Sequence, residues 1–93
     1  MYRIVILYEQ APDPEGYADH VERFCVPPNG VFRHGSVTGA PMGEPAHAYY
    51  AEFEFADKQA FDDFVRSDQF MAAGRDVMER GWQMPAIDFV ELA

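Results

Sequence analysis

The sequence predicts an α+β protein of the ferredoxin-like βαββαβ type, in which a four-stranded antiparallel sheet carries helices on one face. Three observations lead to this prediction. The expected elements follow one another as strand, helix, strand, strand, helix, strand. A loop rich in glycine and proline separates the two middle strands, as in a hairpin. No repeat, low-complexity tract or linker divides the 93 residues, so residues 1–93 are expected to form a single domain.

The first strand and the first helix have clear limits in the sequence. Residues 2–8 form an apolar run that is typical of a strand. Asp13 can accept the free N–H groups of a first helical turn, and Pro14 suits the first helical position because it has no N–H to lose. Pro27-Pro28 cannot continue a helix. These signals predict a helix near residues 14–25.

The two middle strands are predicted at residues 31–38 and 47–55, with turn residues at 39–45 between them. The second of these strands is rich in aromatic residues. The first carries polar side chains, namely Arg33, His34, Ser36 and Thr38. This pattern favours an edge position in the sheet, and a simple solvated edge explains it well.

A second helical region follows the hairpin. Asp57 and Ser67 can each cap a helix. Apolar or small residues recur at helical spacing behind these caps: Phe61, Phe64, Val65, Phe70, Met71, Gly74, Val77, Met78 and Gly81. The pattern fits one kinked helix and two separate helices equally well. Residues 86–92 then close the chain as a strand.

Composition limits the classes of partner. Sixteen acidic against seven basic side chains give a formal charge of −9, which repels nucleic acids and anionic membranes and favours small-molecule or protein partners. The single cysteine, Cys25, cannot form an internal disulfide, and the apolar run Ile4–Leu7 is shorter than a signal-peptide core or a membrane span. We therefore expect a soluble protein of the reducing cytoplasm.

The first strand also predicts an assembly, because it is apolar on both faces. Val5 and Leu7 lie on one face, and Ile4, Ile6 and Tyr8 lie on the other. Helices can cover only one face of a sheet with this topology. The other face is expected to pack against the same face of a second copy, which predicts a homodimer.

His20 is the candidate catalytic residue. At 3.6 residues per turn it shares the buried face of its helix with Tyr17, Val21 and Phe24. An imidazole there can act as a general acid or base, since it titrates near neutral pH. It can equally be a core histidine that binds a backbone carbonyl or a carboxylate. Cys25 is expected only to pack, because a helix C-terminus disfavours a thiolate.

Aromatic residues make up 15% of the chain and can line a pocket for a flat, mostly apolar ligand. The candidates for substrate binding are Tyr8, Tyr17, Phe24, Tyr49 and Trp82. Tyr8 and Tyr49 are best suited to polar contacts, because a buried phenol needs a hydrogen-bond partner. The alternative is that a small core simply needs large residues.

Other side chains predict structural roles. Glu52 can pair with Arg3 or lie at the dimer interface, and an ion pair is favoured over a catalytic base. The histidines lie singly on different elements, without the local spacings of a metal site: His20, His34 and His47. This spacing predicts no metal site. No glycine-rich loop precedes a helix start, so no nucleotide cofactor is predicted either.

Several segments together resemble a known family: the hydrophobic strand ending in Tyr8, Pro12-Asp13-Pro14-Glu15 leading to Tyr17 and His20, Val26-Pro27 after the helix, and residues 49–55. With these segments the chain resembles the EthD-like group of the dimeric α/β-barrel superfamily over nearly its whole length. Two places depart from the family pattern. Cys25 stands where a second histidine is usual, and residues 76–80 read as uninterrupted helix where an Asp-Leu-Pro-Asn-Phe type of segment is expected.

The resemblance implies a dimeric α/β barrel without cofactor, whose pocket lies between the helices and the sheet. Relatives oxidise, cyclise, dehydrate or isomerise aromatic polyketides and related small molecules. Two function classes follow for this chain. One is a cofactor-free enzyme that acts on an aromatic or polyketide-like substrate through His20 and tyrosines. The other is a non-catalytic ligand-binding or accessory homodimer in which His20 is structural.

Overall fold

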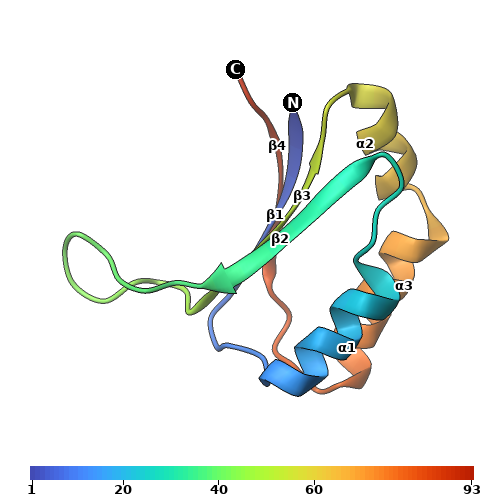
Figure 1. Cartoon of the computed structure of the whole chain (residues 1–93). Helices are drawn as coiled ribbons and strands as arrows, with labels where there is room; N and C mark the ends of the chain where they lie inside the picture. The colour runs from blue at the N-terminus through green and yellow to red at the C-terminus, as the bar shows by residue number, and fades with distance from the viewer.

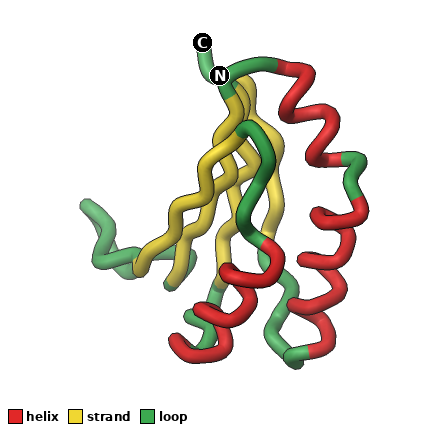
Figure 2. Tube along the Cα trace, turned by 45° about the vertical axis from the view of Figure 1, so that its right-hand side comes forward, coloured by secondary structure: helices red, strands yellow, loops and turns green.

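The computed structural model describes residues 1–93 and confirms the predicted ferredoxin-like fold. The elements in chain order are β1 (Tyr2–Tyr8), α1 (Pro14–Phe24), β2 (Gly30–Ser36), β3 (Tyr49–Phe55), α2 (Lys58–Val65), α3 (Asp68–Glu79) and β4 (Ala86–Glu91). The three helices lie on one face of the sheet and leave the other face open (Figure 1, Figure 2). None of the helices is long and apolar enough to cross a bilayer.

The sheet has the order β2-β3-β1-β4, and all neighbouring strands are antiparallel. β2 is therefore an edge strand, as its polar sequence predicted. The hairpin strands are shorter than predicted: Ala48 N–H donates to the Tyr8 carbonyl at 2.8 Å, while the Ala48 carbonyl still accepts from Val37 N–H at 2.9 Å. The segment 37–48 extends away from the body of the protein as a long loop (Figure 1).

Each helix begins at the cap that the sequence predicted. Asp13 accepts a hydrogen bond from Gly16 N–H at 2.7 Å, and Asp57 accepts one from Ala60 N–H at 2.9 Å. Ser67 has extended backbone angles and accepts from Phe70 N–H at 3.1 Å. Because Ser67 caps a new helix, the second helical region is two helices.

The core lies between the helices and one face of the sheet. Alternate side chains of β1 and β3 point into it and are buried: Ile4, Ile6, Tyr8, Ala51, Phe53 and Phe55. The buried side chains of α3 are Ala73, Asp76 and Val77. The predicted apolar stripe of this helix was wrong in part, because Met71 and Met78 are mostly exposed and Gly81 lies beyond the helix end with a φ of 76°.

The open face of the sheet carries an ion-pair network between neighbouring strands. Arg3 on β1 pairs with Glu54 at 2.8 Å, and Arg33 on β2 pairs with Glu52 at 2.6 Å. The predicted pair of Glu52 and Arg3 is present at 3.8 Å. Tyr50 O–H also donates to Glu52, at 2.6 Å. The two glutamates therefore have structural partners and lie far from the helix side of the sheet.

Candidate active site

His20 lies on the inner face of α1 and is only 3% exposed. Its Nδ1 is 2.7 Å from Oδ2 of Asp76, which α3 presents toward α1. The sequence allowed a backbone carbonyl or a carboxylate as the partner of a buried His20, and the structure shows a carboxylate. The interaction joins two helices that lie next to each other on the sheet, so it fixes both the ring and the helix pair.

Asp76 is held in its charged form. Burial alone would raise its pKa, but hydrogen bonds from Arg80 and His20 bring the pKa below the ordinary value of an aspartate. Arg80 Nε donates to the same carboxylate at 2.6 Å, and the Arg80 guanidinium also pairs with Asp19. An ionised carboxylate can only accept hydrogen bonds. When the imidazole is neutral, Nδ1 therefore carries the proton and Nε2 is left as a free base.

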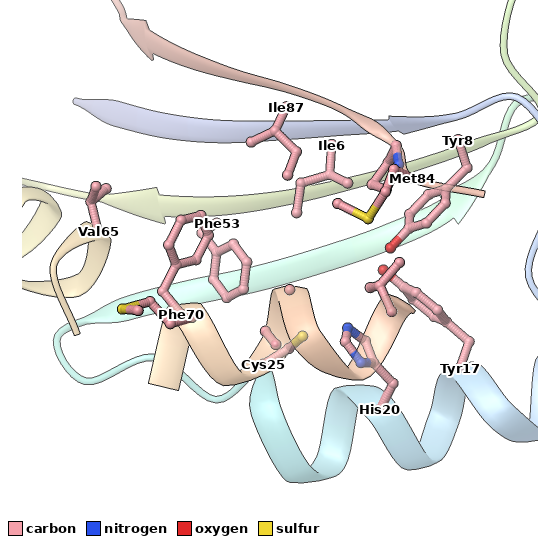
Figure 3. Close-up of a pocket in the computed structure, with 15 residues that line it drawn as sticks. Ile6, Tyr8, Tyr17, His20, Cys25, Phe53, Val65, Phe70, Met84 and Ile87 are labelled. Atoms are coloured by element: carbon pink, nitrogen blue, oxygen red, sulfur yellow. The ribbon is translucent and has the colours of Figure 1, made fainter. Parts of the chain in front are cut away.

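Nε2 of His20 is open to a cavity. It has no hydrogen-bond partner in the protein. Every side-chain nitrogen or oxygen that is fully buried does have a hydrogen-bond partner. Nε2 is therefore accessible to a water-sized molecule, although the residue as a whole is buried. His20 lines a cavity of about 300 Å³ between α1, α3 and the sheet (Figure 3).

Two phenols share the end of the cavity that holds His20. The hydroxyl groups of Tyr8 and Tyr17 face each other there (Figure 3), and their rings make an edge contact with a centroid distance of 5.8 Å. Burial raises the pKa of Tyr8 to about 12 and raises the pKa of Tyr17 as well. Both phenols are thus protonated at neutral pH and can donate hydrogen bonds to a ligand oxygen.

Cys25 also lines the cavity and is 4% exposed. Burial, followed by the negative charge of Asp76, raises the pKa of its thiol to about 12. The thiol is therefore a poor nucleophile at neutral pH, in keeping with the packing role expected from the sequence.

The other predicted substrate-binding residues lie around this site. Phe24 and Trp82 do not line the cavity; they pack on the ring of His20, with centroid distances of 5.8 Å and 5.6 Å. Tyr49 also lies outside the cavity, in an outer groove beside α1, where its hydroxyl is 2.6 Å from Nδ1 of His34. Tyr17 lines both the cavity and the groove. The structure thus brings Tyr8, Tyr17 and His20 together and places the remaining three as their supports or neighbours.

No group of three or more histidine, cysteine, aspartate or glutamate side chains is arranged to hold a metal ion. The three histidines stay on separate elements. His20 pairs with Asp76, whereas His34 pairs with Tyr49.

Solved structures with this architecture are known. An EthD family protein from Bacillus halodurans aligns with a TM-score of 0.75 and 23% identity over 100% of this chain and 99% of its own. The chain therefore shares the fold of this protein. A dimeric ferredoxin-like protein of unknown function from Jannaschia sp. aligns with a TM-score of 0.65 and 19% identity, covering 98% and 97% of the two chains.

A third protein of similar architecture has a described activity. SnoaB, a cofactor-independent oxygenase from Streptomyces nogalater, aligns with a TM-score of 0.55 and 15% identity over 99% of this chain and 90% of its own. The sequence itself matches no family model and no curated protein. These likenesses establish the fold of this chain, and its chemistry has to be argued from its own residues.

Asp76 and Arg80 are the site residues that the sequence analysis missed. The signal was present, because Asp76 lies between Ala73 and Val77 on the buried stripe of α3, and an arginine follows it by four residues. A carboxylate on an apolar helix face needs a partner, and Arg80 satisfies only part of that need. Residues 76–80 therefore supply both the carboxylate that binds His20 and the arginine that shares it.

Proposed function

We propose that this protein is a cofactor-free enzyme that moves a proton on an aromatic or polyketide-like small molecule bound between the helices and the sheet. The observation that carries the proposal is that His20 lines a largely apolar cavity and has Nδ1 fixed by Asp76, which leaves Nε2 without a partner in the protein. A histidine arranged in this way is a base of defined direction.

The chemistry follows from the three polar groups at one end of the cavity. Nε2 of His20 takes a proton from an acidic C–H or a phenol O–H of the ligand. The imidazolium that forms is stabilised by the ionised carboxylate of Asp76. Tyr8 and Tyr17 donate hydrogen bonds to the enolate or phenolate oxygen as negative charge develops on it. Return of the proton to another atom completes an isomerisation, and an anion held in this way is also the starting point for cyclisation, dehydration or oxidation.

The fold supports this class of function. SnoaB is described as a cofactor-independent oxygenase, and it shares the architecture but little sequence with this chain. We also propose that the protein is a homodimer, since the open sheet face holds the half-buried side chains of Val5 and Leu7, and one structural neighbour is described as dimeric. The two proposals are independent, because the cavity lies on the helix side of the sheet.

The second candidate function is a ligand-binding or accessory homodimer without turnover. It is favoured by the contacts of His20 with Phe24, Trp82 and Asp76, which suffice to explain a buried histidine as a link between helices. Cys25 also favours the ligand-binding function, because a buried thiol stands where the family that the chain resembles usually has a second histidine.

The exchange of α-protons of 2-tetralone for deuterium, followed by NMR in D2O, separates the two functions without knowledge of the natural substrate. We expect the wild-type protein to accelerate exchange and His20→Ala to lose about a hundredfold to ten-thousandfold of that rate. The matched control is His47→Ala, which removes a histidine of the 37–48 loop that does not line the cavity and should retain the rate. Equal rates for wild type and His20→Ala would remove the catalytic assignment.

Binding and stability complete this test. If His20 is catalytic, His20→Ala should keep the fold and still bind 2-tetralone. The ligand-binding alternative predicts a different result. The wild type would then show no exchange activity, and His20→Ala would melt several degrees lower but bind 2-tetralone as the wild type does.

A further inference from the structure

The cavity has two chemically different ends. Tyr8, Tyr17 and His20 gather at one end, and Val65 and Phe70 lie at the other (Figure 3). The polar end is the more deeply buried, since each of its three side chains is at most 3% exposed. The cavity therefore suits a ligand with one polar end and one apolar end.

Helix α3 forms the wall that joins the two ends. Asp76 binds His20 at the polar end, and Phe70 lies nearly two helical turns earlier, at the apolar end (Figure 3). Seven residues of helix span about 10 Å, so an extended chain of several methylenes fits along this wall. Gly74 lies between the two ends and lines the cavity.

Gly74 has no evident structural reason to be a glycine. It lies inside α3 without a positive φ, and a Cβ placed there would meet no heavy atom within 4 Å. A glycine inside a helix is less favourable than an alanine, because it loses more backbone entropy on folding. Neither backbone geometry nor crowding excludes a side chain, so the helix carries a destabilising residue at a wall of the cavity.

The rim of the cavity is apolar and adaptable. Met71 is 56% exposed and Met84 50%, and Ile87 on β4 is also exposed. All three line the cavity while remaining accessible to solvent. Methionine side chains are flexible and fill irregular spaces, which suits contact with a chain that leaves the cavity between α3 and β4.

We propose that the ligand is amphiphilic, with a phenol or enolisable carbonyl at His20 and an apolar chain that runs along α3, and that Gly74 is the residue that admits this chain. The inference rests on the proposed function for the head group and goes beyond it in the class of substrate. Gly74 acts as a specificity-determining residue: it contributes space, and a side chain at this position would occupy the path of the ligand.

A series of 4-alkylphenols tests the proposal by isothermal titration calorimetry. Phenol, 4-ethylphenol, 4-butylphenol and 4-hexylphenol present the same head group with a growing chain. We expect the dissociation constant to fall about fourfold for each methylene that enters the cavity. Affinity that does not change from phenol to 4-hexylphenol, or the absence of binding by every member, would overturn the proposal.

Substitution of Gly74 locates the chain. Gly74→Leu should bind phenol as the wild type does and lose the gain from longer chains, so that 4-hexylphenol binds at least tenfold more weakly than to the wild type. Arg75→Leu is the control, since it places the same side chain on the exposed side of the same helical turn. Wild-type chain-length dependence in Gly74→Leu would refute the role of Gly74.

Gly74→Ala guards against a folding defect. It should raise the melting temperature by about 4 °C or more, because alanine is the better helix former, while binding 4-hexylphenol less tightly. Greater stability with unchanged affinity would also count against the role of Gly74.

The two proposals fail in different ways. If affinity depends on chain length and on Gly74 but His20→Ala loses no proton exchange, the chain-binding inference stands and the catalytic function does not. If His20→Ala abolishes exchange while affinity is independent of chain length, the reverse holds.

Discussion

Replacing Asp76 with asparagine is the sharpest test of the site. The substitution keeps the shape of the side chain and removes its charge. In the wild type, one carboxylate oxygen accepts from His20 at 2.7 Å and from Arg80 at 2.6 Å, and the side chain is only 11% exposed. Hydrogen bonds to a buried charged group contribute about 1.5–3 kcal/mol, and a neutral amide oxygen in the same place accepts both bonds at reduced strength. We therefore expect Asp76→Asn to lose about 2 kcal/mol of stability.

The loss should appear as a fall of roughly 10 °C in the melting temperature at pH 7. The matched control is Asp19→Asn, which removes a carboxylate from the same arginine at a position that is 51% exposed. That change should cost less than about 1 kcal/mol, because solvent screens an exposed pair. Thermal melts of the three proteins at equal concentration make the comparison.

The effect of pH gives an independent check. Because the pKa of Asp76 is lowered in the folded state, its contribution to stability is complete above its unfolded pKa of about 4 and is lost as the pH falls through the lower folded value. The difference between wild type and Asp76→Asn should therefore shrink below about pH 4. A difference that stays constant down to pH 3, or no difference at pH 7, would refute our account of the pair.

The same variant should also lose proton exchange. An asparagine is neutral, so it cannot stabilise the imidazolium charge that forms on His20 when Nε2 takes a proton. We expect the exchange rate with 2-tetralone to fall at least about a hundredfold, the lower range for loss of a general base. A variant that loses stability and keeps the full rate would show that Nε2 does not need Asp76.

Two further predictions concern assembly and the cysteine. Light scattering should give twice the chain mass of 10.6 kDa, and Leu7→Glu on the open face should give monomers; a monodisperse wild-type monomer would contradict the dimer. Iodoacetamide at pH 8 should alkylate Cys25 slowly in the native protein and rapidly in urea, since burial raises its pKa to about 12 only in the folded state; rapid native alkylation would contradict this.

The sequence predicted the fold well because its local signals agree with the tertiary structure. Asp13, Asp57 and Ser67 cap helices whether or not the rest of the chain is considered, and the two apolar faces of β1 follow from simple alternation. The hairpin ends were less predictable. Ala48 bonds both to Val37 across the hairpin and to the Tyr8 carbonyl, and only the packed sheet brings Tyr8 within reach of its N–H.

The candidate site was predicted in part for the same reason. Helical periodicity is enough to bury His20 and Tyr17 on one face of α1. It cannot tell which residue of another helix will meet them, because the relative position of α1 and α3 depends on packing between segments that are 56 residues apart. Asp76 was therefore seen as part of a helix, and its role emerged only from the contact with His20.

The ion pairs on the open face bear on how two copies can approach each other. The chain carries an excess of nine negative charges, yet the two arginines and two glutamates of this network cancel, and Asp88 on β4 leaves the face with a single excess charge. Most of the surface therefore repels a second copy, whereas this face does not. When two copies meet, repulsion between their negatively charged surfaces would favour the orientation in which the nearly neutral sheet faces approach each other, before any apolar contact is made.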